Sequence, residues 1–336
     1  MPDHSRRHLE PALSTFDLAR PLPDHLRGAH VAIGNFDGVH RGHQAVLAAA
    51  LDRAEAAGRP TLALTFEPHP RSFFSPDRPV FRLTPAEAKA RLVRALGLDG
   101  LVVCRFDADF AALGAEAFVA DVLVGRLGLS GATIGWDFHF GHGREGTPAF
   151  LDAAGRRHGF TVDVVDPFSS EDGETVSSSR IRAALAAGDL AEAAGLLGYR
   201  WFVEGTVVGG DRRGRDLGFP TANIRLPDDC DLAHGVYAVT FAVDGVVRDG
   251  VANWGRRPQF DDGAPVLETF VFDFSGDLYG KAAEVTFVSR LRAEAKFPSV
   301  ADLVAQMHLD CAEARAVLTS RSPGTALDRA LAEAFA

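Results

Sequence analysis

The first half of the chain alternates short apolar runs with longer stretches rich in alanine and leucine. Short, nearly continuous apolar runs are typical of strands buried on both faces of a parallel sheet, and the longer stretches are helix-like. The predicted strands are residues 30–33, 61–66, 101–104, 132–136 and 161–165. The predicted helices lie between them, at residues 44–57, 85–96, 115–127 and 148–158. Because strands that alternate with helices need crossover connections, this half is predicted to be an α/β domain with a parallel sheet.

The second half changes to short strands separated by glycine, aspartate and proline. Residues 177–197 are predicted to be helical, and the strands after them predict an antiparallel β domain. Asp244-Gly245 lies between two apolar runs and predicts a hairpin, because Asp-Gly accepts the positive φ angles of a type I′ turn. Further strands are predicted at residues 267–274 and 284–289, and a helix at residues 299–318. We therefore predict two domains, residues 1–186 and residues 187–336.

Length and composition agree with a globular protein of two domains. The chain has 336 residues, of which 46% are hydrophobic and 24% charged. No window approaches the roughly 18 to 20 uncharged apolar residues of a spanning helix, so we expect a cytoplasmic protein with no membrane partner. Cys104, Cys230 and Cys311 lie too far apart for a disulfide framework or a CxxC zinc site. The net charge of −10 disfavours a nucleic-acid partner, while local basic pockets for a small phosphate ligand remain compatible with it.

The first candidate site is the segment 34–43, which joins the first predicted strand to the first predicted helix. It reads Gly34-Asn35-Phe36-Asp37-Gly38-Val39-His40-Arg41-Gly42-His43. Ligands of open α/β sheets bind at the carboxyl ends of strands, and the free N–H groups of a helix N-terminus bind phosphate. His40 and His43 would reach the same phosphates, Gly42 permits close backbone approach, and Gly34 and Gly38 permit the turn.

The spacing of this segment matches neither GxGxxG nor GxxxxGK[ST], which disfavours a dinucleotide-dependent dehydrogenase and a P-loop kinase. Two histidines indicate instead the stabilisation of charge at phosphorus. An attacking phosphate is already ionised and needs no general base, so nucleotidyl transfer suits this arrangement. Two alternatives stay open here: the histidines decorate a helix start, or they bind zinc with a third ligand that the sequence does not reveal.

Two further strings offer groups for phosphate. Ser178, Ser179 and Arg180 supply hydroxyls and a positive charge at the start of a predicted helix, although such a string is often a solvated cap. Gly210 and Gly214 interleave with arginines in a loop that could cover phosphates, although a charged run of this kind is often a solvated turn.

The chain resembles the family of bacterial bifunctional riboflavin kinases and FMN adenylyltransferases, also called FAD synthetases. His40-Arg41-Gly42-His43 matches the HxGH signature of nucleotidylyltransferases, and the strings at residues 65–70, 135–141 and 176–182 follow in the family's order. Pro220-Thr221-Ala222-Asn223 resembles the PTAN motif of riboflavin kinases. The resemblance spans roughly residues 15 to 320. It implies an α/β Rossmann-like nucleotidyltransferase domain followed by a six-stranded antiparallel β-barrel riboflavin-kinase domain with a C-terminal helix.

The resemblance also implies the reactions. Riboflavin and MgATP would give FMN, and FMN and MgATP would then give FAD and pyrophosphate, so ATP, riboflavin and FMN are the expected partners and Mg²⁺ the expected metal. His40, His43 and Glu268 are the expected catalytic residues. Glu268 shares a strand face with Phe270 and Phe272 and would be the base for the ribityl hydroxyl.

The remaining expected roles divide by ligand. Thr221 would bind the metal, and Asp137 and Phe138 would bind the flavin. The residues expected to bind ATP or its phosphates are Gly34, Asn35, Phe36, Gly38, Gly42, Ser178, Ser179, Arg180, Gly210, Gly214 and Asn223.

Four positions depart from the family's pattern. His139 stands where Arg is usual, Gln259 where Thr is usual, Phe270 where His is usual, and Ser179 where Thr is usual. Because His139, Gln259 and Phe270 are among them, one rival hypothesis is an enzyme that has lost one of the two activities. A second rival is a flavin or nucleotide sensor without catalysis, although the damaged catalytic positions expected of such a sensor are not visible. No sequence feature specifies the oligomeric state, direct exchange of FMN between sites, the preferred flavin redox state or the reversibility of adenylylation.

Overall fold

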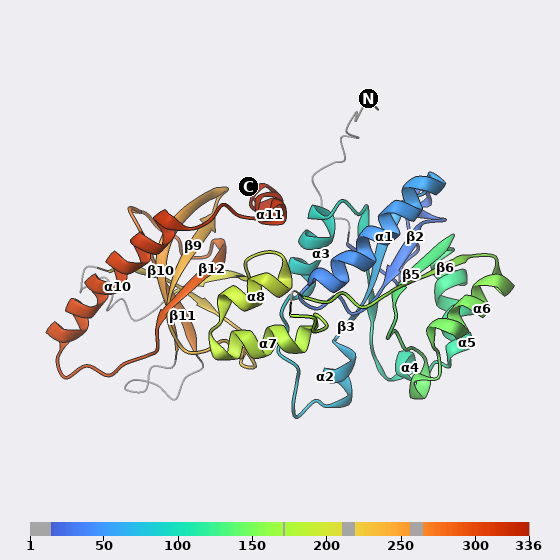
Figure 1. Cartoon of the computed structure of the whole chain (residues 1–336), viewed down its shortest axis with the longest axis horizontal. Helices are drawn as coiled ribbons and strands as arrows, with labels where there is room; N and C mark the ends of the chain where they lie inside the picture. Colours follow the sequence, from blue (N-terminus) through green and yellow to red (C-terminus); the bar gives the residue numbers. More distant parts are fainter. Residues whose placement is uncertain (1–14, 171, 210–218, 256–264, 336) are drawn as a thin grey trace. The chain divides into compact units, whose positions relative to one another are not determined.

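A six-stranded parallel sheet and a closed six-stranded antiparallel barrel make up the β structure of the computed structural model (Figure 1). The structure describes residues 15–170, 172–209, 219–255 and 265–335. The chain divides into two compact units that interleave along the sequence. The sheet unit contains the described residues up to Asn35, together with Leu47–Pro68 and Leu96–Val165. The barrel unit contains Phe36–Val46, His69–Ala95 and the described residues from Asp166 onward.

The sheet has the strand order β1-β4-β3-β2-β5-β6, and every neighbouring pair is parallel. Its strands are β1 (Thr15–Asp17), β2 (His30–Ile33), β3 (Thr61–Glu67), β4 (Gly100–Arg105), β5 (Gly131–Gly135) and β6 (Thr161–Val165). All five predicted strands are present. β2 is buried along its whole length, which explains its unbroken apolar character. The chain leaves β2 toward β3 on one side while β5 pairs on the other, so β2 marks the switch point where such sheets bind ligands.

The helical segments that continue from these strands match the predicted ones closely. They are α1 (Arg41–Ala57), α4 (Ala108–Ala111), α5 (Ala115–Ala117), α6 (Pro148–His158), the π-helix η2 (Phe118–Leu127) and the 3-10 turns η1 (Asp24–Leu26) and η3 (His142–Arg144). The predicted helix 115–127 is thus one α turn followed by a π-helix, which ends at Gly128 with φ 56°. η2, η1, α6 and the sheet share one apolar core that includes Leu26, Val31, Phe118 and Leu151.

The barrel closes in the order β10-β11-β8-β7-β12-β9. Its strands are β7 (Phe202–Val208), β8 (Thr221–Arg225), β9 (Gly235–Val243), β10 (Val246–Gly255), β11 (Val266–Val271) and β12 (Ala282–Arg292). Asp244 and Gly245 both have positive φ, at 48° and 73°, as the predicted β9–β10 turn requires. The architecture implied by the family resemblance, a parallel α/β sheet followed by an antiparallel barrel, is therefore confirmed.

Within the described residues, six helices belong to the barrel unit. They are α2 (Pro70–Phe74), α3 (Ala86–Ala95), α7 (Ser178–Ala187), α8 (Leu190–Leu197), α10 (Val300–Ser320) and α11 (Ala326–Phe335). The predicted helix 177–197 is two helices, because Gly188 ends α7 with φ 77° and Asp189 caps α8. α10 begins at the predicted cap Ser299 and packs Ala314 and Leu318 against the barrel strands. α11 was not predicted; it packs against α3.

A buried ion cluster ties α3 to two barrel strands and to α11. The guanidinium of Arg91 on α3 binds the carboxylates of Glu204 on β7 and Glu284 on β12, the latter at 2.7 Å, and donates to the Leu331 carbonyl at 3.0 Å. The Arg91 and Glu284 side chains are 7% and 8% exposed. Because charges removed from water need partners, this cluster fixes how the 69–95 segment sits on the barrel.

Removal of Arg91 tests that dependence. The variant Arg91→Ala leaves two carboxylates together without their shared cation, so we expect the free energy of unfolding to fall by about 3–5 kcal/mol. The control Arg156→Ala removes an exposed i,i+4 pair with Asp152 and should cost less than about 0.5 kcal/mol. Urea unfolding measures both; equal stability of the two variants would contradict the role of the cluster.

Candidate active sites

The loop between β2 and α1 is held by a buried carboxylate. Asp37 is 1% exposed, forms an ion pair with Arg182 of α7, and accepts a hydrogen bond from the Thr84 amide at 3.1 Å. The Ser178 hydroxyl donates to the Asp37 carbonyl at 2.8 Å. These contacts join three segments distant in sequence at one loop, and all of them lie within the barrel unit.

The neighbouring residues of the loop are held in a strained conformation. Phe36 and Val39 have φ of 48° and 39°, a region that costs side chains other than glycine roughly 1–3 kcal/mol. Gly38 takes φ 86° without that cost; its amide donates to the Thr84 hydroxyl at 2.8 Å, and its carbonyl accepts from the Tyr199 hydroxyl at 2.7 Å. Tertiary contacts therefore impose the loop shape.

This loop delivers His40 and His43 to the start of α1. Their rings stack with centroids 3.6 Å apart, and Phe36 lies edge-on to His43 at 5.4 Å. A Cβ at Gly42 would come within 3.2 Å of the His40 ring, so glycine leaves room for the stacked pair. The structure thus brings together the two predicted catalytic histidines.

Both histidines are neutral at pH 7 in this environment. Burial lowers the pKa of His40 to about 4, with Asp37 opposing the change and Arg182 adding to it. Burial also lowers the pKa of His43 well below its usual value, and its electrostatic interactions with His40 and with Lys89 lower it further. Positive charge around the loop therefore comes from Arg182 and Lys89, and the histidines provide neutral ring nitrogens. The His43 Nδ1 has no hydrogen-bond partner within the described part of the chain.

A third buried histidine belongs to the same charged surroundings. His69 is 7% exposed and caps α2 by accepting from the Arg71 amide at 3.1 Å. Burial lowers its pKa to about 4, against the opposing effect of Asp37 and with further lowering by Arg82, Arg182 and Lys89. The sequence prediction did not include His69, although it belongs to the family-like string at residues 65–70.

The start of α7 separates the predicted phosphate-binding residues into two groups. Ser178 contacts the loop, and Ser179 lines a hollow together with Arg182 and Arg71. The guanidinium of Arg180 instead pairs with Asp172 at 2.9 Å and Glu192 at 2.7 Å.

The structure therefore places Arg182, and not the predicted Arg180, beside the loop. Helical spacing could have identified it, because Ser178 and Arg182 are four residues apart and share a helix face.

The remaining predicted residues of the adenylyltransferase site lie at the carboxyl ends of β2 and β5 in the sheet unit. The Gly34 amide donates to the Leu64 carbonyl at 3.1 Å, and the Asn35 carbonyl accepts from the Thr65 hydroxyl at 2.9 Å. After β5, Phe138 stacks on Phe140 at 5.5 Å and packs against the core, while Asp137 is exposed. Asp137 thus offers the exposed polar group of this pair.

The predicted kinase residues lie in register on neighbouring strands. Asn223 of β8 pairs with Glu268 of β11, and Thr221 pairs with Phe270. The Thr221 hydroxyl donates to the Asn223 Oδ1 at 3.4 Å. Directly opposed residues project to the same face of a sheet, so these side chains form one group. Gly210, Gly214 and Gln259 lie outside the described residues.

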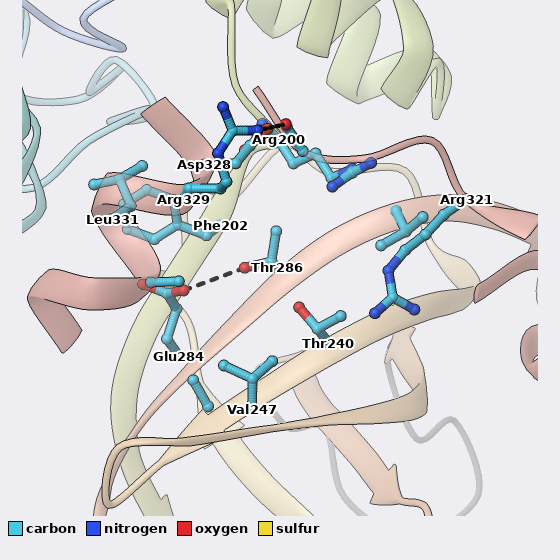
Figure 2. A pocket seen from close by; sticks show the side chains of 14 residues that line it. Arg200, Phe202, Thr240, Val247, Glu284, Thr286, Arg321, Asp328, Arg329 and Leu331 are labelled. Carbon is cyan, nitrogen blue, oxygen red and sulfur yellow. Dashed lines mark hydrogen bonds between the residues drawn. The ribbon is translucent and has the colours of Figure 1, made fainter. Parts of the chain in front are cut away.

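A pocket on the barrel unit contains none of the predicted site residues. Figure 2 shows Thr240, Val247 and Thr286 on the barrel strands, with Arg321 and Arg329 from the C-terminal segment around them. The Glu284 carboxylate of the ion cluster also lines it and accepts from the Thr286 hydroxyl at 3.2 Å.

Metal-binding clusters and membrane-spanning helices are both absent from the residues that the structure describes. Across the described ranges, no three His, Cys, Asp or Glu side chains are grouped so as to hold a metal ion. Within the same ranges, no helix is both long and apolar enough to cross a membrane.

Two known protein families match the chain, one over its first half and one over its second half, in the same order as its motifs. Residues 22–180 match the model of the FAD synthetase family, and residues 197–318 match the model of the riboflavin kinase family. α11 follows the second match.

Individual proteins align with both parts of the chain. The chain is 40% identical to the bifunctional riboflavin kinase/FMN adenylyltransferase of Haemophilus influenzae, over 88% of this chain and 96% of that protein. It is 42% identical to the protein of that name from Pseudomonas fluorescens, over 88% of this chain and 94% of that one. A crystal structure described as a macrolide-efflux protein from Streptococcus pneumoniae is also similar, with TM-score 0.79 and 30% identity over 92% of this chain and 99% of that chain.

The buried histidines predict how stability depends on pH. Their pKa values in the folded protein lie below the unfolded value of about 6.5, so between pH 6.5 and pH 4 the unfolded chain binds more protons. Acidification through this range should destabilise the protein, with each of His40 and His69 contributing up to roughly 3 kcal/mol.

Urea unfolding between pH 4.5 and pH 7 measures this effect. The variants His40→Gln and His69→Gln should each show a shallower loss of stability than the parent. The exposed His25→Gln is the matched control and should keep the parent slope. Equal slopes in all three variants would show that burial does not keep these histidines neutral.

Proposed function

The chain belongs to the family of bifunctional riboflavin kinases/FMN adenylyltransferases, and we propose that it catalyses both reactions of that family. The kinase reaction converts riboflavin and ATP to FMN and ADP. The adenylyltransferase reaction converts FMN and ATP to FAD and pyrophosphate. The observation that carries the proposal is the presence of two separate residue groups in one chain, the stacked His40–His43 pair and the Thr221, Asn223 and Glu268 group.

In the adenylyltransferase reaction, a phosphate oxygen of FMN attacks the α-phosphorus of ATP, and the bond to the departing pyrophosphate breaks. The nucleophile is already ionised, so the protein must position the reactants and stabilise the developing charge. His40 and His43 hydrogen-bond to the phosphates, and Arg182 and Lys89 supply positive charge. Bound phosphates would favour protonation of the histidines, because a nearby negative charge favours the charged form.

The other roles that we propose for this reaction are those that the family resemblance implies. Ser178 and Ser179 at the start of α7 bind the triphosphate, and Arg180 joins them only if it leaves Asp172 and Glu192. The exposed Asp137 and its neighbour Phe138 contact the flavin. The residues of the β2–α1 segment that we assign to ATP are Gly34, Asn35, Phe36, Gly38 and Gly42.

In the kinase reaction, Glu268 takes the proton of the ribityl hydroxyl of riboflavin. The ribityl oxygen forms a bond to the γ-phosphorus of ATP, and the bond between that phosphorus and ADP breaks. Thr221 and Asn223 offer hydroxyl and amide oxygens, the ligand type that Mg²⁺ prefers, so the donor set suits a metal held mainly by substrate phosphates. When bound, Mg²⁺ would neutralise phosphate charge. The hydrogen bond from Thr221 to Asn223 leaves the hydroxyl lone pairs available to the metal. Gly210 and Gly214 would cover the phosphates.

The proposal includes a cytoplasmic enzyme that acts on small molecules, without a nucleic-acid or membrane partner. The two family matches and the bifunctional relatives agree with the motifs and support this function. The efflux description belongs to one similar structure, and no motif of this chain corresponds to it. The departures at His139, Gln259 and Phe270 leave loss of one activity as the competing hypothesis.

Substitution of His40 tests the adenylyltransferase assignment. His40→Ala removes a ring that contacts the reacting phosphates, so FAD formation from supplied FMN should fall by about 10²–10³-fold. FMN formation from riboflavin should stay within about twofold of the parent. Chromatography of the flavins after fixed reaction times measures both, with His25→Ala as the exposed control. Loss of both activities in a folded His40→Ala protein would refute the separation of sites.

Substitution of Glu268 tests the kinase assignment in the opposite direction. Glu268→Gln keeps the side-chain shape but removes the base, so FMN formation should fall by about 10²–10⁴-fold. FAD formation from supplied FMN should persist. The exposed Glu313→Gln on α10 is the matched control for removal of one carboxylate. Retained kinase activity in Glu268→Gln would exclude Glu268 as the base.

A further inference from the structure

Tyr199 lies in the segment that joins α8 to β7, residues 197–201, which we call the junction segment. The Tyr199 hydroxyl donates to the carbonyl of Gly38, 161 residues away along the chain, at 2.7 Å. Gly38 stands two residues before His40 in the loop between β2 and α1. We propose that Tyr199 is a positioning residue of the adenylyltransferase site, whose hydroxyl fixes the peptide that leads into His40. The proposal rests on the assignment of His40 to that reaction, and all of these residues belong to the barrel unit.

The environment of Tyr199 commits its hydroxyl to this contact. The side chain is 1% exposed. Burial raises the pKa of the hydroxyl well above its usual value, and the electrostatic interactions with Asp37 and Asp328 act in the same direction, so the group keeps its proton and donates. Gly38 is buried as well. Loss of the hydroxyl would therefore remove a hydrogen-bond donor from a buried carbonyl, which is costly to leave unpaired.

The junction segment also contacts the chain after the two histidines. Gln44 follows the second histidine on α1, and its side-chain amide donates to the Leu197 carbonyl at 2.6 Å and to the Val39 carbonyl at 2.8 Å. Gly198 permits this approach, because a Cβ there would lie 3.2 Å from the Gln44 Oε1. Hydrogen bonds from the junction segment thus lie on both sides of the histidine pair.

The junction segment is itself held by the barrel and by α11. Trp201 is 3% exposed and stacks on Phe287 of β12 with ring centroids 5.1 Å apart. Its Nε1 donates to the Leu83 carbonyl at 3.0 Å. The Arg200 amide donates to the Asp328 carboxylate of α11 at 2.8 Å. The junction segment can therefore serve as a fixed support for the loop.

Support at Gly38 matters because the chain between it and His40 is strained. Gly38 and Val39 have φ of 86° and 39°, and strained backbone persists only where its surroundings determine it. The Gly38 amide is held by the Thr84 hydroxyl at 2.8 Å, and its carbonyl by Tyr199. Release of the carbonyl would let the His40 ring move relative to the reacting phosphates. A misplacement of about 1 Å can lower a rate by about 10²-fold.

The substitution Tyr199→Phe tests the proposal by removing the hydroxyl while keeping the ring. We expect kcat for FAD formation from supplied FMN to fall by about 10-fold, because the histidines act on the charge that develops during reaction. KM for FMN should stay within about twofold of the parent. FMN formation from riboflavin should also stay within about twofold, which reports that the barrel is folded.

Tyr237→Phe is the matched control. Tyr237 on β9 is 0% exposed, and its hydroxyl also donates to a backbone carbonyl, that of Ala233. The two variants lose the same kind of buried hydrogen bond, and urea unfolding compares the cost to stability. Tyr237→Phe should keep kcat for FAD formation within about twofold of the parent, because its hydroxyl does not contact the loop.

A double substitution tests whether Tyr199 acts through His40. Tyr199→Phe combined with His40→Ala should be no more than about twofold slower in FAD formation than His40→Ala alone, because residues that act as a unit are not additive. An unchanged kcat in Tyr199→Phe, an equal fall in Tyr237→Phe, loss of FMN formation together with FAD formation, or additive losses in the double variant would each overturn the proposal. Retained FAD formation in His40→Ala would instead refute the assignment of the histidine on which it rests.

Discussion

The buried carboxylate of Asp37 is the group on which the loop between β2 and α1 depends. A charge that is 1% exposed must be compensated within the protein, and Asp37 is compensated by Arg182 and by the Thr84 amide. Those partners come from segments about 50 and 150 residues away along the chain, so the loop acquires its shape only after the fold has formed. These contacts maintain the strained backbone conformations of Phe36 and Val39. The loop shape that results positions the two histidines.

The two sites solve different chemical problems with different kinds of scaffold. At the proposed adenylyltransferase site the nucleophile would already be charged, and the chain provides neutral histidines near fixed cations. At the proposed kinase site the nucleophile would be an alcohol, and the chain provides a carboxylate whose opposed residues on the adjacent strands are amides. Strand register fixes the second group, whereas long-range polar contacts fix the first.

Much of the fold could be predicted from the sequence, because local patterns determine it. Parallel strands buried on both faces read as apolar runs, and Asp244-Gly245 specifies its turn through the positive φ angles of both residues. Three features could not be predicted in this way. The edge strand β1 has three residues and one neighbour, the interleaving of the two units arises from contacts such as Arg91 with Glu284, and α11 follows the segment that carries the motifs.

The motifs identified the candidate sites, but not the partners of each side chain. Arg180 and Arg182 are both cations near the start of one helix. In the structure Arg180 pairs with Asp172 and Arg182 pairs with Asp37. Their partners depend on the direction of each side chain from the helix and on the carboxylates nearby. The most direct test of the central claim is a time course of the purified protein with riboflavin, ATP and Mg²⁺, in which the flavins are separated by chromatography. FMN should appear first and then be converted to FAD with release of pyrophosphate. FMN that accumulates without FAD, or supplied FMN that is converted while riboflavin is not, would contradict the presence of both activities.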